Sequence, residues 1–392
     1  MLLTIDRSRL NKVLSIMGRT TGAKLINPVL GCVLLTTKED KLKLFTTNNE
    51  AATKIGIEAC VMNEGGCAVP VTLLSNIVGC IPAVFKEIKL EYKQEKKQLA
   101  ISYANNVYHV AAFEPEAFKN HAIDFKPDVN VLVYGSRLKT MLENTVIACE
   151  TKNSDRPQLQ GLKMILEKDM LEIAGTDSRR MCICRSQLPT ASEKGFDVMI
   201  PGKMIKTLIS HLSDSGDVML AVNENRTMIA IGEPDVFVFA RLMDVEFVDY
   251  KNFIPADREN YVMGNTAEIL MLFSGAQPIA AQNNNLVSFV VKEDGLHVNA
   301  ESAETGDASL KLKCETAGKT KEISVNCNYM IDVFRFSEKY QVKMSFGTKV
   351  TDPIHIKPIQ PESSGKTDES KTGKPELIDY DFDWIVMPVR QS

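Results

Sequence analysis

Apolar residues of this 392-residue chain recur in a helical pattern at three places, about a third of its length apart. Apolar positions at i, i+3, i+4 and i+7 are typical of the buried face of an amphipathic helix. Such a stripe is formed by Leu10, Val13, Leu14 and Met17, by Leu138, Met141 and Leu142, and by Ile269, Leu272, Phe273 and Ala276. Their first positions lie 128 (138 − 10) and 131 (269 − 138) residues apart. One helix repeated at nearly constant spacing predicts one structural unit used three times.

Two further patterns keep this spacing. A second apolar stripe is formed by Leu74, Ile77, Val78 and Ile81, by Ile205, Leu208, Ile209 and Leu212, and more weakly by Met330, Val333 and Phe334, with Ser337 in the last place. Between the stripes, apolar and polar residues alternate, as in half-buried antiparallel strands. The alternating stretches are KLKLFTTNN from Lys41, MLEIAGTDS from Met170 and GLHVNAESA from Gly295, with Leu42, Leu171 and Leu296 in register.

These patterns predict three similar α+β domains, each with two helices on one face of its antiparallel sheets. We expect boundaries near Pro127 and Ala256, which gives domains 1–126, 127–255 and 256–392. A chain of this length is expected to form two to four domains. Three unrelated α+β domains are the alternative, but they would not be expected to keep three patterns in one register.

The charge balance changes what partners are expected. Lysine and arginine total 46 against 50 acidic residues, which leaves a formal charge of −4. General adhesion to nucleic acid needs many cations that neutralise phosphates, so the acidic total argues against it. A basic stripe on one face is still compatible with this total.

Cysteine usage and the N-terminus bear on location. The nine cysteines are scattered without a CxxC pair, and the five histidines show no metal-binding spacing. Cys182 and Cys184 are two apart on an expected strand, so they face the same side. The start, MLLTIDRSRL, has charges too early for a signal peptide, and no apolar run approaches the ~18 residues of a membrane span. We expect reduced thiols, no metal and a cytoplasmic protein.

The end of the chain contains two contrasting segments. Residues 360–374, QPESSGKTDESKTGK, lack large apolar side chains, and we expect a disordered surface loop there. The following DFDWIVMPVR carries the only tryptophan, Trp384, and a dense apolar cluster. Such a cluster is expected to dock against the fold rather than form a free tail.

Motifs of catalysis are missing from the sequence. Neither phosphate-binding glycine motif, GxGxxG or GxxxxGK[ST], occurs, and there is no GxSxG nucleophile elbow. GTDSRR at 175–180 places Asp177 beside two arginines, which could handle phosphate or perform catalysis. The alternative is a strand end followed by a turn in which Asp177 bonds nearby backbone. We favour the turn, and we expect neither enzyme activity nor a cofactor.

Six segments resemble the family of bacterial DNA polymerase III β subunits, the sliding clamps. They are NPVLGCVLL (27–35), RPQLQGLKMIL (156–166), LEIAGTDSRRM (171–181), FVDYKNFIP (247–255), VNCNYMIDVF (325–334) and MPVR (387–390). The segments follow the family order from the first helix to the end of the chain. GTDSRR, the DY…IP segment and the terminal MPVR are together highly specific for the family.

The resemblance implies a fold and a function. In this family each subunit has three similar α+β clamp domains, and two subunits close head to tail into a ring, with helices lining the hole and antiparallel sheets outside. Double-stranded DNA passes through the ring without sequence-specific contacts. The ring tethers the DNA polymerase III catalytic subunit, the clamp loader and other proteins with clamp-binding motifs. The implied homodimer contact joins domain one of one chain to domain three of the other.

Cations near the repeated helices are candidates for DNA contacts. Lys24, Arg156 and Lys203 match positions near DNA in the family, and Arg19, Arg137 and Lys139 lie beside the same helices. A solvated charged surface is the alternative for each of them. Modest positive charge suits a sliding ring, since strong phosphate contacts would hinder sliding.

The resemblance also implies a hydrophobic groove between domains two and three for short peptides, typically with Gln followed by Leu and Phe. By position its wall includes Leu159, Thr176, Ser178, Arg179, Arg180, Met181, Val248, Asn252, Phe253, Asn326, Tyr329, Val350, Thr351, Met387, Pro388, Val389 and Arg390. Ordinary core packing is the alternative for Leu159, Met181 and Phe253. Ser178, Val248 and Asn252 depart from the Gly, Pro and basic residue common in the family, which bears on motif preference.

Two other classes of protein fit part of the pattern. A cytosolic three-repeat interaction scaffold that does not encircle DNA would show the same periodicity. It would not be expected to combine GTDSRR with a terminal MPVR. An enzyme acting on nucleic acid would need carboxylates or a nucleophile at fixed spacing, which the sequence does not show.

Overall fold

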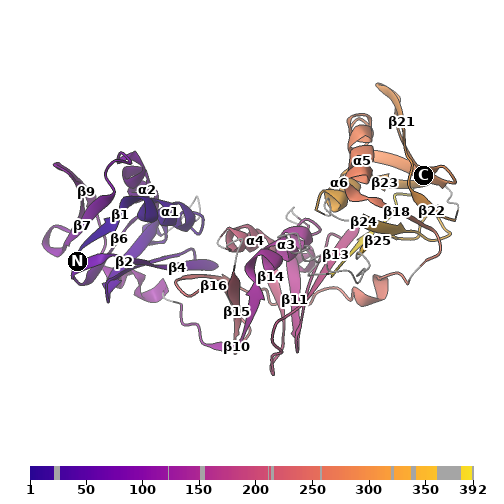
Figure 1. Ribbon diagram of the computed structural model, residues 1–392. Helices are drawn as coiled ribbons and strands as arrows, with labels where there is room; N and C mark the ends of the chain where they lie inside the picture. Colours follow the sequence, from indigo (N-terminus) through magenta and orange to yellow (C-terminus); the bar gives the residue numbers. More distant parts are fainter. Residues whose placement is uncertain are drawn as a thin grey trace, which may run out of the picture. The chain divides into compact units, whose positions relative to one another are not determined.

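The computed structural model of the chain describes residues 1–21, 27–121, 123–150, 155–210, 212, 216–256, 258–318, 322–336, 341–359 and 381–390 (Figure 1). The expectations for Lys24, for Ser337 and for the 360–374 loop lie outside these residues. The described contacts group the chain into two compact units, Met1–Lys139 with Lys203–Asp244, and Thr140–Gly202 with Val245–Ser392. Each unit is described separately below.

Unit 1 contains two antiparallel sheets. The five-stranded sheet has the order β5(Cys60–Asn63), β1(Leu2–Asp6), β7(Glu87–Lys93), β8(Gln98–Tyr103) and β9(Asn106–Ala111). The eight-stranded sheet has the order β10(Pro127–Tyr134), β15(Asp217–Asn223), β16(Met228–Glu233), β17(Val236–Arg241), β4(Ala51–Glu58), β3(Lys41–Thr47), β2(Cys32–Lys38) and β6(Gly65–Pro70). This unit also contains three short 3-10 helices, η1(Pro28–Gly31), η2(Gln94–Lys96) and η3(Pro115–His121).

Unit 2 also contains two antiparallel sheets. The nine-stranded sheet has the order β14(Phe196–Pro201), β11(Gly161–Glu167), β12(Met170–Thr176), β13(Arg180–Gln187), β26(Asp381–Val386), β25(Ile354–Ile359), β24(Gln341–Ser345), β18(Tyr261–Asn265) and β22(Glu315–Ala317). The four-stranded sheet has the order β21(Gly306–Leu312), β20(Gly295–Ser302), β19(Leu286–Lys292) and β23(Ile323–Asn326). Two 3-10 helices, η4(Pro157–Leu159) and η5(Lys251–Phe253), belong to this unit.

Each α-helix in the described residues begins directly after a strand. The six helices are α1(Arg7–Met17), α2(Val71–Cys80), α3(Gly135–Val146), α4(Gly202–Ile209), α5(Thr266–Ala280) and α6(Cys327–Phe336). Side chains cap α1, α5 and α6. Asp6 accepts from the Arg9 amide at 2.7 Å, Asn265 from the Ala267 amide at 2.8 Å, and Asn326 from the Asn328 amide at 3.0 Å. Within the units, α1 packs on α2 and α5 packs on α6 (Figure 1).

The repeated stripes form the buried faces of these helices. Leu10 on α1, Leu138 on α3 and Ile269 on α5 are each 0% exposed, which confirms the prediction of equivalent buried positions. Each such side chain contributes roughly 1.5–3 kcal/mol of hydrophobic free energy. The second stripe needs a correction: Ile81 and Leu212 are buried as expected, but they lie past the ends of α2 and α4.

The alternating stretches form strands, as predicted. Leu42 in β3, Leu171 in β12 and Leu296 in β20 are all fully buried. The apolar C-terminal segment forms β26, which pairs with β13 and β25 and buries Trp384 to 1% exposure. The expectation that this segment docks is therefore confirmed.

Both large sheets cross a predicted domain boundary. In unit 1, β4 pairs with β17, and in unit 2, β13 pairs with β26. The central third of the chain therefore contributes strands to both units, which explains why contacts give two compact units. The boundaries near Pro127 and Ala256 stay a prediction.

Candidate functional site

A hydrophobic groove of about 210 Å³ lies in unit 2. The elements that form it are η4, the turn between β12 and β13, the connector before η5 and the end of β26. Its lining residues are Leu159, Thr176, Ser178, Arg179, Arg180, Met181, Val248, Tyr250, Phe253, Ile385 and Met387. Phe253 is 64% exposed and Met387 is 41% exposed. Large apolar side chains left open beside a groove are typical of a protein interaction site.

The turn between β12 and β13 is held by side chains that bond its own backbone. The Thr176 hydroxyl donates to the Arg180 carbonyl at 2.7 Å and accepts from the Ser178 amide at 3.1 Å. Asp177 Oδ1 accepts from the amides of Arg179 and Arg180, each at 2.9 Å. Ser178 adopts φ +71°, the left-handed region that favours glycine. Asp177 therefore shapes a turn, as the sequence favoured.

Arg180 connects this turn to α6. Its guanidinium forms ion pairs with Asp177 at 3.1 Å and Asp332 at 2.7 Å, and it donates to the Ile147 carbonyl at 2.7 Å. The guanidinium also lies 4.4 Å from the centre of the Tyr329 ring, a cation–π contact. With only 11% of its side chain exposed, Arg180 forms a fixed wall of the groove.

Beneath the groove, Tyr250 ends a chain of buried polar contacts. Its hydroxyl donates to Glu172, and Arg185 bonds Glu172 at 2.6 Å and Asp383 at 2.5 Å. His355 completes the chain with a 2.7 Å contact to Asp383. Because Asp383 lies on β26, this network holds the strand whose end lines the groove.

The network shifts the pKa values of its members. Burial alone would raise the pKa of Asp383, but hydrogen bonds from His355 and Arg185 outweigh burial and lower this pKa to about 2. Burial, and then the hydrogen bond to Glu172, raise the pKa of the Tyr250 hydroxyl. Tyr250 therefore stays a neutral donor while Asp383 stays an anion.

Nine of the seventeen residues expected at the groove line it in the structure. The eight others lie outside its lining: Asn252, Asn326, Tyr329, Val350, Thr351, Pro388, Val389 and Arg390. Asn252 instead bonds Asp249 at 2.7 Å, and Asn326 accepts amide hydrogen bonds at the start of α6. Their role in binding a peptide stays a prediction.

Sequence reasoning missed Tyr250 and Ile385 as groove residues. Ile385 could have been found, because it is two residues before Met387 and so faces the same side of an extended strand. The sequence indicated Tyr250 more weakly as a groove residue, only as an aromatic side chain in the same connector as Phe253. The amide of Met387 also donates to the Arg179 carbonyl at 2.8 Å, which attaches the tail to the turn.

The candidate DNA contacts lie at or near helices. Arg19 is exposed just after α1, and Arg137 and Lys139 are half-buried on α3. The Arg137 guanidinium lies 4.8 Å from the centre of the Tyr134 ring. Arg156 is exposed beside η4, whereas Lys24 lies outside the described residues. Their contact with DNA stays a prediction.

Lys203 is exposed on α4 and forms an ion pair with Glu50 at 2.7 Å. Both side chains are more than half exposed, and exposed pairs of this kind contribute about 0–1 kcal/mol. A phosphate could therefore replace Glu50 at little cost.

Unit 1 contains a copy of the groove turn, 129 positions earlier (176 − 47). The Thr47 hydroxyl donates to the Ala51 carbonyl at 3.0 Å and accepts from the Asn49 amide at 3.1 Å. Asn48 accepts from the amides of Glu50 and Ala51 at 3.0 and 2.7 Å. Asn49 adopts φ +70°, as Ser178 does in unit 2. The internal repeat therefore extends to individual hydrogen bonds.

Most of the chain is similar to known proteins. Residues 1–122, 133–249 and 251–367 match the N-terminal, central and C-terminal domains of the DNA polymerase III beta subunit. The beta sliding clamp of Bacillus subtilis (strain 168) is 24% identical over 362 residues, which span 88% of this chain and 92% of that protein. The beta sliding clamp of Pseudomonas putida is 23% identical over 346 residues, which span 87% and 92%.

Solved structures give the same fold. The DNA polymerase sliding clamp from Bacillus subtilis superposes with a TM-score of 0.86 at 20% identity, with both chains fully covered. A sliding clamp from Pseudomonas aeruginosa bound to griselimycin gives the same TM-score, identity and coverage. The fold is therefore that of a sliding clamp, with three clamp domains of helices and antiparallel sheets. All three domain matches name one family, and the chain belongs to it: the DNA polymerase III beta subunits.

Proposed function

We propose that this chain is a DNA sliding clamp, a ring-shaped homodimer that encircles duplex DNA and tethers a replicative polymerase and other partners. The observation that carries the proposal is the clamp fold with an open hydrophobic groove in unit 2. Family membership supports the same function. We also propose that it has no catalytic activity and acts in the cytoplasm, where bacterial chromosomes are replicated. None of the helices in the described part is long and apolar enough to cross a membrane.

The groove is proposed to take the short partner peptides. Leu159 and Met181 provide a buried apolar floor, and the open side chains of Phe253 and Met387 are available to close over an occupant. A docking Leu and a docking Phe would each gain roughly 1.5–3 kcal/mol before the costs of association. The turn amides are already bonded within the protein, so apolar contact supplies most of the affinity.

Ring closure is proposed to join two free strand edges. In their own sheets β9 and β21 are the terminal strands, and most of their residues are exposed or half-buried. Val107 on β9 is 51% exposed, and no strand of the described part of the chain pairs with the outer edge of β9. Pairing β9 of one chain with β21 of the other, twice in a dimer, would cover both edges.

Loading on closed DNA tests the proposed encirclement. The full chain is incubated with a clamp loader, ATP and nicked circular DNA, and the DNA is then isolated by gel filtration. We expect the protein to stay with the circles and to leave when a restriction enzyme linearises them. Equal retention on linear DNA would indicate ordinary binding, and no retention on circles would favour the scaffold that does not encircle DNA.

Peptide titration tests the groove separately. A fluorescent peptide with Gln followed by Leu and Phe is titrated into wild type, Met181→Ala and Phe253→Ala. We expect each variant to weaken binding by about 1–3 kcal/mol, as at other interface hot spots. Met170→Ala is the matched control, because Met170 is 40% exposed at the start of β12 and lies outside the groove lining. Equal affinity of all four proteins would contradict the proposed groove.

A further inference from the structure

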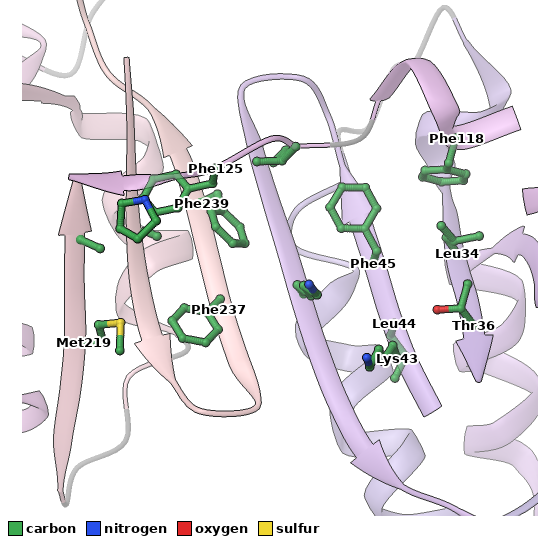
Figure 2. Close-up of a pocket in the computed structure, with 15 residues that line it drawn as sticks. Leu34, Thr36, Lys43, Leu44, Phe45, Phe118, Phe125, Met219, Phe237 and Phe239 are labelled. Atoms are coloured by element: carbon green, nitrogen blue, oxygen red, sulfur yellow. The ribbon is translucent and has the colours of Figure 1, made fainter. Parts of the chain in front are cut away.

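A second apolar hollow, of about 540 Å³, lies entirely within unit 1 (Figure 2). It opens over the eight-stranded sheet where β4 pairs with β17. Phe237 and Phe239 lie on one side and Phe45 on the other, as Figure 2 shows. Phe118 and Phe125, from the segment that leads to β10, complete the aromatic wall. Its volume lies in the range of ligand-binding sites, roughly 300–1,000 Å³.

The hollow results from the side chains that share one face of the sheet. Strand register places Phe45, Lys54 and Phe237 side by side on β3, β4 and β17. The next partner along this row is a glycine on β16, and Ala230 on β16 stands opposite Phe239. The large ring of Phe239 therefore stands beside the small side chain of Ala230, and both residues line the hollow.

In unit 2 the repeat fills the equivalent surface. Lys54 corresponds to Ile183 (183 − 54 = 129), and Ile183 is buried in a cluster with Met181 and Tyr250. At the position of Tyr250, unit 1 has His121 (250 − 121 = 129). His121 instead contacts Asn49 at 3.0 Å, in the copied turn. The aromatic residue that packs against Ile183 in unit 2 thus has a histidine as its counterpart in unit 1, and this histidine does not line the hollow.

The charged side chains that line the hollow are all positive. Lys43 and Lys54 line it, and none of the described residues that line it is acidic. Within the described part of the chain, neither lysine forms an ion pair. Cations beside aromatic walls complement a segment that carries both apolar side chains and carboxylates.

We propose that this hollow is a second docking site, which takes a peptide segment of a partner protein with aromatic or aliphatic residues next to Asp or Glu. The apolar side chains would occupy the space between Phe45 and Phe237, and the carboxylates would pair with Lys43 and Lys54. The hollow shares no residue with the groove in unit 2. A clamp with two different sites per chain could hold two partners with different motifs.

Fluorescence anisotropy with two synthetic peptides tests this site. The probes are a fluorescein-labelled peptide with a Phe-Leu-Phe centre flanked by aspartates, and the same peptide with lysines instead. Both are titrated into the full chain and into variants Ala230→Leu, which fills the hollow, and Lys54→Glu, which reverses its charge. Met181→Ala, in the groove of unit 2, is the matched control.

The expected results separate this site from the groove. The acidic peptide should bind better than the lysine peptide, lose about tenfold or more in Ala230→Leu, and lose affinity in Lys54→Glu. Met181→Ala should leave the affinity of the acidic peptide unchanged. The Gln-Leu-Phe peptide should lose affinity in Met181→Ala and keep it in both hollow variants. Equal binding of both charged peptides, or no loss in either hollow variant, would overturn the proposal. Circular dichroism checks that Ala230→Leu is folded. If it is not, Lys54→Glu alone tests the proposal, because Lys54 is exposed and its replacement does not disturb the core.

Sedimentation with phosphatidylglycerol vesicles tests a lipid occupant. Protein that sediments with these vesicles, and stops doing so in Lys54→Glu, would replace the peptide proposal by a lipid site. Protein that stays in the supernatant, together with the acidic-peptide result, supports the proposal. Failure of the Gln-Leu-Phe peptide to bind would count against the groove and leave this test unaffected.

Discussion

The buried network beneath the groove makes a strong prediction for Asp383→Asn. Asp383 is 2% exposed and contacts His355 at 2.7 Å and Arg185 at 2.5 Å. Asparagine keeps the size of the side chain and removes its charge. We expect this one change to destabilise the sheet of unit 2 that carries the floor of the groove.

Two independent arguments set the magnitude. Removing one partner of a buried ion pair costs about 3–5 kcal/mol, and the low end applies here because Arg185 keeps its bond to Glu172. The pKa of Asp383 falls from 3.8 to about 2, and at about 1.4 kcal/mol per pH unit its charge contributes about 2 kcal/mol. We therefore expect a loss of about 2–3 kcal/mol in the free energy of unfolding near pH 7.

The only tryptophan provides the assay. Trp384 follows Asp383 on β26 and is 1% exposed, so its fluorescence reports unfolding of this sheet. Urea titrations of wild type and Asp383→Asn should differ in midpoint with similar slopes. Asp381→Asn is the matched control, because Asp381 lies on the same strand with 53% of its side chain exposed. An Asp383→Asn midpoint equal to that of this control would refute the reasoning.

The dependence on pH gives a second check. A carboxyl whose pKa is lowered on folding stabilises the protein above its unfolded pKa and loses this contribution as pH falls through its folded pKa. The difference between wild type and Asp383→Asn should be constant above about pH 4 and shrink between about pH 4 and 2. A difference that grew as pH fell would contradict the assigned pKa.

Three further predictions concern the groove, DNA and the cysteines. Deleting residues 387–392 should abolish binding of the Gln-Leu-Phe peptide, because Met387 lines the groove. Light scattering should still find a dimer, because residues 387–390 belong to neither β9 nor β21; a monomer would contradict this. Lys203→Ala should reduce the slope of log binding constant against log salt concentration by about 1. Glu50→Gln should strengthen DNA binding by releasing Lys203; equal affinity of wild type and both variants would remove Lys203 from the DNA contacts. A thiol reagent at pH 8 should label Cys60 and Cys80 rapidly and all nine cysteines only after unfolding, since most of the others are buried; rapid labelling of more than three would contradict the described burial.

The thiol prediction follows from burial rather than from disulfides. All nine cysteines are free in the structure. Burial raises the pKa of Cys67 to about 12 and that of Cys32 to about 11, so both stay protonated at neutral pH. Cys182 and Cys184 do face the same side of their strand, with sulfur atoms 3.8 Å apart, as their spacing predicted.

Helices and strands were predictable because the three repeats place buried residues at fixed intervals. Leu10, Leu138 and Ile269 face the interior for the same geometric reason, and the 3.6-residue period reveals this without a structure. The ends of α2 and α4 were harder to predict. Ile81 and Leu212 continue the apolar period after the backbone has left the helix, because packing and not helical hydrogen bonding selects these residues.

The groove was only partly predictable from the chain. Its turn was visible as GTDSRR, since Thr176 and Asp177 bond backbone within four residues. The network of Glu172, Arg185 and Asp383 joins residues as far as 211 positions apart (383 − 172), and no local period reports such pairing. Sequence patterns predict helices, strands and turns, whereas the contacts between distant strands depend on the register of the folded sheet.

The two copies of the turn explain why a repeated scaffold can carry different sites. Thr47 and Thr176 make the same backbone hydrogen bonds, so both copies of the turn are held in the same way. The residues packed against the turns are free to differ, and Tyr250 corresponds to His121. In unit 2 the tyrosine packs on the sheet and lines the hydrophobic groove, whereas in unit 1 the histidine bonds the turn and the hollow lies over the sheet. The same turn therefore stands beside different apolar surfaces in the two units, because the residues packed around it differ.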